Sequence, residues 1–397
     1  MRTTCRRSPG RVDGGGDRQR LDHFEISVDR RRIDEDSPRS TSGHPAAALG
    51  RPVEERQVDR LRGAVYFICG FRHGAMDARD VDLLMEVQYD FPLAERPYKV
   101  VGERVGVDEG WVIERLRELV KAGTLKRIGA ILNYRSRGLE AALVGMAVPE
   151  GIIEEVAAAV NGDPQVSHNF QRDYKPYNLW FVTKANSREE LEAKVAAVAK
   201  RYGLDYIILY SLRSYKVDVR FDLRRGISWT KGELLPENPP SLSSLGIPMA
   251  FFSKVRSLPL VPEPFKEAAE ALGLAVPETL EKMRELIRLG VLRDLHGTID
   301  GEAVGFRENA MVVLREPVCE EAARLNITTH VVLRNTVPGK WPYPCYFMVH
   351  GVSRQVLEDY IEDAVRKLGV SEYRLLYSVR DFLGGSEMGR RVEKVAE

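Results

Sequence analysis

The chain carries one pattern of polar and apolar residues twice, and this internal repeat constrains its fold more than any other feature. The first copy is Val166-Ser-His-Asn-Phe-Gln-Arg172, with the apolar run Leu179-Trp-Phe-Val182 after it. The second copy is Thr329-His-Val-Val-Leu-Arg334, with Tyr346-Phe-Met-Val-His350 after it. Each copy has a histidine, an arginine four residues later, a short turn with proline and a hydrophobic run. Two matches in the same context indicate a duplicated structural unit.

Length and charge set the bounds for that unit. A chain of 397 residues is long enough for two or more domains with cores of their own. Its net charge of +1 gives no overall attraction to nucleic acid or to a membrane surface, so recognition of charge has to be local. No apolar run approaches the roughly 18 residues of a membrane span, which predicts a cytoplasmic protein without a membrane partner.

The cysteines are few and scattered. Cys5, Cys69, Cys319 and Cys345 form no CxxC pair, and they are too sparse for a disulfide framework. We therefore expect free thiols in a reducing cytosol, and no metal site built from cysteine.

Residues 1–62 differ in composition from everything after them. Their basic residues are all arginine, and they contain Gly14-Gly-Gly16, clusters of serine and proline, and little periodic hydrophobicity. This predicts a disordered segment, or a spurious extension translated from a start site upstream of the true one. A functional basic arm is the alternative, although interleaved acidic residues weaken it.

Residues 76–135 have the pattern of a winged helix-turn-helix. The apolar spacing predicts a helix over Asp77–Tyr89 and a shorter one over Tyr98–Val105. Asp108 is a typical N-cap for a third helix. A strand-like stretch, Leu125–Tyr134, follows as the wing.

Residues 136–223 predict a ferredoxin-like plait with the order βαββαβ. Its predicted elements are Ala141–Val148, Gly151–Asn161, Gln165–Arg172, Tyr177–Lys184, Ser187–Tyr202 and Asp205–Arg213. One face of such a sheet carries both helices, and the other face is free for a ligand or a second sheet.

The same arrangement then begins again. Residues 224–250 are rich in proline and serine and predict an extended linker. Residues 251–300 predict a second winged helix-turn-helix, and residues 301–385 a second plait. The second winged unit is predicted from Phe265–Ala271, Glu278–Leu289 and the wing Val291–Leu295. The expected fold class is α+β, with two tandem copies of a winged helix-turn-helix plus a ferredoxin-like plait.

This architecture resembles the Lrp/AsnC regulators, and several motifs resemble a narrower group on the same fold, the siroheme decarboxylases. The motifs of the first half are Arg127-Ile-Gly-Ala130, Arg137-Gly-Leu139, Val166-Ser-His-Asn-Phe-Gln-Arg172 and Tyr177-Asn-Leu-Trp-Phe181. In the second half, Glu308-Asn-Ala-Met-Val312 and Trp341-Pro-Tyr343 resemble the partner subunit of those enzymes. The resemblance covers about residues 76–385, and the chain looks like a fusion of the two subunits.

The resemblance implies a substrate and a reaction. The substrate would be siroheme, an iron tetrapyrrole with many carboxylates, which loses CO2 from two acetate side chains to give didecarboxysiroheme on a heme or heme d1 route. Because the conjugated macrocycle can delocalise the electrons left behind, no further cofactor such as pyridoxal phosphate or thiamine is expected. The substrate carries its own iron, we predict no metal site in the protein, and heme binding stays an open alternative.

His168 and His330 are the candidate proton donors. Imidazole titrates near neutrality, and His168 is the only histidine between Ala75 and Asp294. A satisfied structural histidine in a sheet is the alternative for each, and ligation of the substrate's iron is another.

Arg172 and Arg334 are the candidate carboxylate-binding residues. Each follows its histidine by four positions, and even spacing on a strand predicts that both side chains share one sheet face. A planar guanidinium binds a carboxylate through two hydrogen bonds. A surface ion pair at a strand end is the alternative.

Other candidates follow from position. Arg213 and Lys216 come after the last predicted strand of the first plait and could add positive charge to the same rim. Tyr177, Trp341 and Tyr343 could offer flat apolar surface to the macrocycle, although aromatic residues in strands more often belong to the core. His350 and His296 are weaker candidates.

The second copy departs from the family pattern. His330 is followed by the apolar Val331-Val-Leu333, where a more polar run is usual. We therefore expect the site in the first half, or at an interface between the two plaits of an internal pseudo-dimer. Whole chains could also associate as a homo-oligomer.

A DNA-binding regulator is the rival from another class. Its recognition helices would meet phosphate, yet the third helix opens with Asp108-Glu109, and its counterpart carries Pro277-Glu278. Carboxylates at a helix N-terminus repel phosphate, so nucleic acid is not an expected partner. A heme-sensing or other non-catalytic tetrapyrrole-binding protein is the third alternative.

Overall fold

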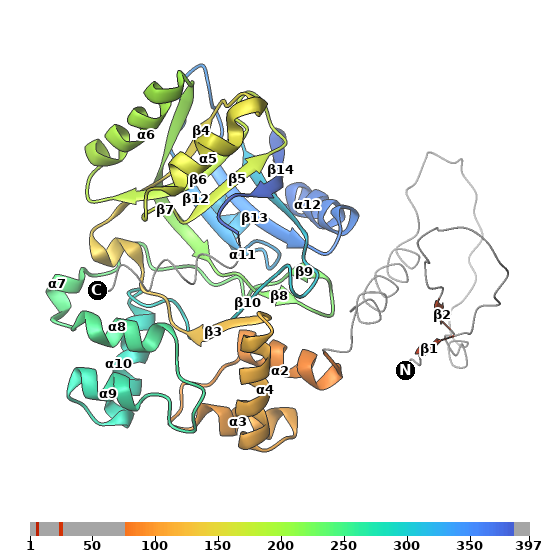
Figure 1. Ribbon diagram of the computed structural model, residues 1–397, viewed down its shortest axis with the longest axis vertical. Helices are drawn as coiled ribbons and strands as arrows, with labels where there is room; N and C mark the ends of the chain where they lie inside the picture. The colour runs from red at the N-terminus through yellow and green to blue at the C-terminus, as the bar shows by residue number, and fades with distance from the viewer. Residues whose placement is uncertain (1–4, 8–23, 27–75, 385–397) are drawn as a thin grey trace, which may run out of the picture. The chain divides into compact units, whose positions relative to one another are not determined.

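The computed structural model describes residues 5–7, 24–26 and 76–384 (Figure 1). The chain divides into two units, Met1–Gly70 and Phe71–Glu397. Of the first unit, the strands β1 (Cys5–Arg7) and β2 (Phe24–Ile26) are described, and they pair with each other. The rest of the segment predicted to be disordered lies outside the described residues.

The first winged unit has the three predicted helices. They are α2 (Ala78–Tyr89), α3 (Pro97–Val105) and α4 (Glu109–Lys121). Asp77 caps α2 through its side chain, and the carboxylate of the predicted N-cap Asp108 accepts from the Trp111 backbone N–H at 2.9 Å. Strand β3 (Leu125–Gly129) is shorter than the predicted wing.

The second winged unit differs from its prediction in two elements. Its helices are α8 (Met249–Arg256), α9 (Lys266–Leu272) and α10 (Val276–Arg288). The first helix, α8, begins inside the predicted linker, where Phe251, Phe252 and Val255 supply its buried face. The wing strand is β10 (His296–Ile299) rather than the predicted residues 291–295.

The two wings pair with each other across the halves. β3 and β10 form an antiparallel two-stranded sheet in which Gly129 lies opposite His296. Gly129 is required there because a Cβ would lie 2.1 Å from the backbone oxygen of Arg256 in α8. Each half therefore completes the wing of the other.

Both plaits have the predicted order of elements. The first consists of β4 (Glu140–Met146), α5 (Ile153–Asn161), β5 (His168–Arg172), β6 (Leu179–Ala185), α6 (Arg188–Tyr202) and β7 (Tyr206–Val217). The second consists of β11 (Glu308–Leu314), α11 (Cys319–Arg324), β12 (His330–Arg334), β13 (Cys345–Gly351), α12 (Arg354–Leu368) and β14 (Tyr373–Asp381). The 3-10 turns η1 (Tyr134–Arg137) and η2 (Glu150–Ile152) connect elements of the first half. The strand orders β7-β4-β6-β5 and β14-β11-β13-β12 are those of a ferredoxin-like plait.

The two plaits join into one closed sheet. β5 pairs with β14 of the other plait, and β7 pairs with β12, so the ring β11-β14-β5-β6-β4-β7-β12-β13 closes through the pairing of β11 with β13. Helices α5 and α6 pack on the outside of the first plait, and α11 and α12 on the outside of the second (Figure 1). Figure 1 shows the helices of both winged units below this barrel.

The segment between the halves is only partly the predicted linker. It contains the short strands β8 (Phe221–Asp222) and β9 (Ile227–Ser228) and the short helix α7 (Leu242–Leu245). β9 extends the barrel sheet beside β13, where Gly351 lies opposite Ile227. The start of this segment is therefore part of the folded sheet.

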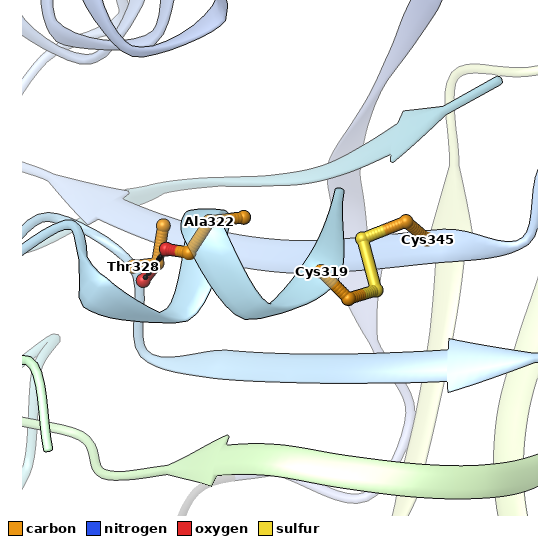
Figure 2. The surroundings of a disulfide bond; sticks show 4 residues. All are labelled: Cys319, Ala322, Thr328 and Cys345. Carbon is orange, nitrogen blue, oxygen red and sulfur yellow. Dashed lines mark hydrogen bonds between the residues drawn. A yellow bond between two sulfur atoms is a disulfide. The ribbon is translucent and has the colours of Figure 1, made fainter. Parts of the chain in front are cut away.

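Two cysteines predicted to be free are joined. Cys319 at the start of α11 and Cys345 at the start of β13 form a disulfide, with Cα atoms 5.5 Å apart. Figure 2 shows it at one end of α11, and toward the other end of this helix the hydroxyl of Thr328 donates to the backbone oxygen of Ala322 at 2.9 Å. The expectation of free thiols is wrong for this pair, because folding brings together two residues that are 26 positions apart.

No helix among the described residues is both long enough and apolar enough to cross a membrane.

Candidate functional site

The two predicted histidines meet at the junction of the plaits. His168 is the first residue of β5 and His330 the first residue of β12, which are equivalent strands of the two halves. Their rings lie 6.2 Å apart in an edge-to-face arrangement. Both side chains are half-buried, so they keep part of their surface open. The structure thus builds one site from both halves.

The predicted face of β5 is confirmed. The His168 ring lies 6.3 Å from the ring of Phe170, and the Arg172 guanidinium lies 5.4 Å from the same ring. The intervening Asn169 points the other way, because its side chain donates to the backbone oxygen of Ala157 in α5. The even spacing of His168 and Arg172 therefore places both inside the barrel.

Cations surround the histidine pair. Lys184 lies in β6 and His350 holds the equivalent position in β13, five residues after the first residue of each strand. Arg293 reaches the site from the segment between α10 and β10. Arg172, Lys184, His350 and Arg293 are the charged groups that most strongly affect His168, and all four carry or can carry positive charge.

This environment keeps the histidines neutral. Burial, with Lys184 and Arg172 next in effect, lowers the pKa of His168 to about 4. Burial, with His168 and His350 next in effect, holds the pKa of His330 well below its ordinary value. Burial and Arg172 lower the pKa of His350 to about 4. At pH 7 the imidazoles are therefore uncharged.

Arg172 and Arg334 are tied to opposite halves. Nη1 of Arg172 donates to the backbone oxygen of Leu376 in β14 at 2.7 Å. Nη1 of Arg334 donates to the backbone oxygen of Leu209 in β7 at 2.9 Å. Each arginine thus stabilises one junction between the plaits, and burial lowers the pKa of each to about 10. Because each guanidinium makes these bonds through Nη1, its other N–H groups can donate to a ligand.

Several buried polar atoms at this junction have no hydrogen-bond partner among the residues that the structure describes. They are Nε of Arg127, Arg172 and Arg334, the hydroxyl of Tyr134, and Nε2 of His350. An unsatisfied buried donor costs about 1–3 kcal/mol, which is why native proteins contain few of them. Arg127 and Tyr134 belong to this group because both act electrostatically on Arg293, and Tyr134 also acts on Arg334. The unpartnered donors and the cations of this cluster suit the binding of an anionic ligand.

The predicted aromatic platform is part of the core instead. Tyr177 is 2 % exposed, Trp341 1 % and Tyr343 4 %. The ring of Trp341 packs within 5.1 Å of Trp180 and within 5.3 Å of Tyr343 inside the barrel. These residues offer no open face to a ligand, and they stabilise the contact between the two plaits.

Arg213 and Lys216 do not join the rim. Strand β7 continues to Val217, so both residues lie within it, and they pair with Leu333 and Val331 of the helix-covered core. Lys216 Nζ donates to the backbone oxygens of Leu325 and Thr328 at 2.8 and 2.9 Å. Arg213 lies over the Tyr215 ring and pairs with Glu237 at 3.5 Å. Both side chains face away from the histidines.

The weaker histidine candidates separate. His350 belongs to the cluster, whereas Nδ1 of His296 lies 3.1 Å from Oδ1 of Asp294, which also binds the buried Arg220. This second group ties the winged units to the segment after β7.

Sequence patterns alone did not point to Lys184, Arg293, Tyr134 or the side chain of Arg127 as members of the site. For Lys184 a signal existed, because it follows Trp180 and Val182 at even spacing on one strand, as His350 follows Tyr346 and Met348. For Arg293 and Tyr134 no periodic signal existed, because both lie in irregular segments that only the tertiary fold brings to the site.

Two protein families match both halves of the chain. The AsnC-like ligand binding domain matches residues 136–216 and 303–383. The siroheme decarboxylase NirDL-like HTH domain matches residues 80–125 and 256–293.

Similar proteins span nearly the whole described region. The siroheme decarboxylase NirDL subunit of Paracoccus pantotrophus is 33% identical over 318 residues, covering 77% of this chain and 96% of that protein. The siroheme decarboxylase of Hydrogenobacter thermophilus is 30% identical, covering 76% and 91%. The siroheme decarboxylase NirD subunit of Stutzerimonas stutzeri is 36% identical, but it covers only 37% of this chain with 96% of its own length.

Solved structures agree with these relatives. The crystal structure of the siroheme decarboxylase NirDL matches 80% of this chain and 99% of its own, with 29% identity and a TM-score of 0.53. A second crystal structure of NirDL, in co-complex with an iron-uroporphyrin III analogue, matches with 28% identity and the same TM-score of 0.53.

Proposed function

The chain belongs to the siroheme decarboxylase family, and we propose that it removes CO2 from two acetate side chains of siroheme at the histidine cluster between its plaits. The observation that carries this assignment to particular residues is the pair His168 and His330, one from each half, with rings 6.2 Å apart and cations around them. The product would be didecarboxysiroheme.

Carboxylate recognition follows from the unpartnered donors. Siroheme carries carboxylates that remain after the reaction, and these need cations to hold them. Arg127, Arg172 and Arg334 each keep a buried Nε without a partner in the described part of the chain, and a carboxylate would satisfy it by a charge-assisted hydrogen bond. Arg293 adds positive charge. The cost of leaving these groups unpaired in the free protein would be recovered on binding.

The histidines serve the proton step. When CO2 leaves, the macrocycle takes up the electron pair, and the carbon must gain one proton to become a methyl group. Neutral imidazole suits this site because it can hold a proton on one ring nitrogen and accept another on the second. Substrate carboxylates would also raise the histidine pKa values by opposing the surrounding cations.

Both halves are needed for this arrangement. The relative that consists of a single NirD subunit covers 37% of the chain, whereas the NirDL subunit of Paracoccus pantotrophus covers 77%. Here the two halves form an internal pseudo-dimer that shares one barrel. Further association of whole chains remains a prediction.

A DNA-binding role finds little support in the same structure. β3 and β10 pair with each other, so neither wing is available as a separate arm. At the start of α4, Glu109 is bound to Arg96, and Arg104 of α3 is bound to Glu86. These arginines are therefore already neutralised within the chain.

The test is anaerobic incubation of the purified protein with siroheme, followed by mass spectrometry of the tetrapyrrole. We expect the loss of two CO2. An unchanged siroheme mass, with substrate that a related decarboxylase does convert, would reject the proposed activity.

Single replacements test the histidines. His168→Ala and His330→Ala should each lower kcat by about 10²–10⁴-fold if each takes part in proton transfer. His296→Ala is the matched control, because His296 lies outside the cluster. Full activity in both cluster variants would show that the histidine assignment is wrong.

A further inference from the structure

The two histidines of the site are supported differently. Nδ1 of His168 lies 3.2 Å from the hydroxyl of Ser167, and the same hydroxyl accepts a hydrogen bond from Lys184 Nζ at 3.2 Å. The three groups form a continuous chain from a lysine to an imidazole. The arrangement of the two histidine rings does not depend on this chain of hydrogen bonds.

The direction of these hydrogen bonds follows from the donors available. A lysine ammonium can only donate, so the Ser167 oxygen accepts from Lys184. The single hydroxyl hydrogen of Ser167 is then free to point at His168, which makes Nδ1 the acceptor. With the hydroxyl hydrogen directed in this way, the ring proton of neutral His168 sits on Nε2, the nitrogen that remains for a ligand.

We propose that Lys184, Ser167 and His168 form a proton relay that delivers the proton for the new methyl group. The inference rests on the proposed decarboxylation and adds a direction and a source for its proton. Lys184 is a positioning and supply residue in this scheme, because it acts through Ser167 and His168 rather than on the substrate.

The relay delivers one proton for each CO2 that is lost. The bond between the methylene carbon and the carboxylate breaks, and its electron pair passes into the macrocycle and returns to form the new C–H bond. The proton for that bond leaves Nε2 of His168 while Nδ1 takes the proton of Ser167, and Ser167 takes one from Lys184. Lys184 is left neutral, and solvent returns its proton before the next turnover.

The surroundings of Lys184 suit a residue that gives up a proton. Burial first, then Arg293 and Arg137, lower its pKa to about 8, and Asp163 acts weakly in the other direction. Asp163 is itself engaged by the hydroxyl of Thr183 at 3.1 Å. On the imidazole side, burial first, then Lys184 and Arg172, oppose a second proton on His168. His168 therefore passes a proton on more readily than it stores one.

His330 lacks an equivalent supply. Its Nδ1 lies 3.3 Å from the hydroxyl of Thr329, which donates to the backbone oxygen of Met348 at 3.3 Å. The position that matches Lys184 is held by His350, whose Nε2 has no hydrogen-bond partner among the described residues. The two halves therefore have different roles, and the proton enters the site from the first half.

Replacement of Lys184 tests the relay because charge and proton release can be separated. Lys184→Arg keeps the positive charge but cannot release a proton near neutral pH. We expect kcat to fall at least about tenfold, with KM near the wild-type value, and Ser167→Ala to act likewise. Lys367→Met is the control, because Lys367 pairs with Asp363 at 2.7 Å on α12, outside the chain of three groups.

Two further readouts distinguish supply from structure. Wild-type kcat should fall as pH rises through the Lys184 pKa of about 8, and this alkaline limb should be absent from Lys184→Arg. Methylammonium should restore part of kcat to Lys184→Ala. Full kcat in Lys184→Arg, with an unchanged pH profile, would overturn the relay while leaving the decarboxylase intact.

A measurement without substrate separates the relay from the proposed activity. In ¹⁵N-histidine-labelled protein, NMR should show His168 with its proton on Nε2, and Ser167→Ala should shift the tautomer equilibrium. A proton resident on Nδ1 of wild-type His168 would refute the relay even if siroheme is decarboxylated. The expected tautomer in a protein that leaves siroheme unchanged would reject the activity and leave the hydrogen-bond chain in place.

Discussion

At the scale of single residues, burial makes protonation of the site's histidines unfavourable. Each imidazole is harder to protonate in the folded protein than in the unfolded chain, where its pKa is about 6.5. The unfolded state therefore binds more protons below that pH. Stability conferred by the neutral forms is fully present above about pH 6.5 and declines as the pH falls toward the folded pKa values, about 4 for His168 and His350.

This gives a prediction for acid stability. The free energy of unfolding should decrease between pH 6.5 and pH 4, by up to about 1.4 kcal/mol per pH unit for each histidine of the cluster. Urea unfolding followed across this range would measure the slope. A variant with His168, His330 and His350 all replaced by Gln should show a smaller slope than wild type. Equal slopes would contradict the neutral state of the histidines.

The same residues show how far sequence alone can go. Even spacing from a repeated motif placed His168 and Arg172 on one face, because alternation along a strand is a local property. Arg213 and Lys216 were misplaced because β7 runs on to Val217 with two irregularities in its pairing with β12. The burial of Trp341 depends on Trp180 of the first plait, and so no pattern within its own segment could reveal it.

At the scale of elements, the sequence predicted the repeated plaits well and the winged units less well. The plait helices and strands have clear periodicity, and their bounds shifted by only a few residues. Helix α8 was missed because prolines and serines flank it, and its apolar residues are recognisable as a buried face only once they pack beside β3. The pairing of β3 with β10 is a contact between distant segments, which local patterns do not encode.

The disulfide between α11 and β13 yields a prediction for element stability. Closing the loop from Cys319 to Cys345 should stabilise the second plait by roughly 3 kcal/mol in the chain-entropy account. Reductant should therefore lower the urea midpoint of wild type to that of a variant with both cysteines replaced by Ala. The variant itself should not respond to reductant. A wild-type midpoint that reductant leaves unchanged would show that the thiols are not joined in solution.

At the scale of the whole molecule, the barrel belongs to neither half alone. The two plaits are joined at two junctions, where β5 pairs with β14 and β7 pairs with β12. Arg172 and Arg334 each reinforce one of these junctions. A single half would expose the strand edges that these pairings cover, and exposed edges promote aggregation.

A split chain tests this dependence. Gly246 is an exposed position with a positive φ of 62° at the end of α7, and a break there severs no strand of the barrel. Residues 76–246 and 247–384 produced together should elute as one complex in size-exclusion chromatography and decarboxylate siroheme. Each piece produced alone should be inactive and prone to aggregate. An active, soluble single piece would show that one half suffices.

The pseudo-dimer has an evolutionary consequence. When two identical subunits form such a site, any substitution appears on both sides at once, and a change useful on one side is tested together with its effect on the other. A fused chain removes that coupling, since each half mutates alone. Lys184 and His350 illustrate this freedom, because they occupy equivalent positions but differ in chemistry. The disulfide is a second example, because Cys345 forms it in the second plait and Leu179 occupies the equivalent position in the first. Specialisation of the halves can therefore proceed one residue at a time.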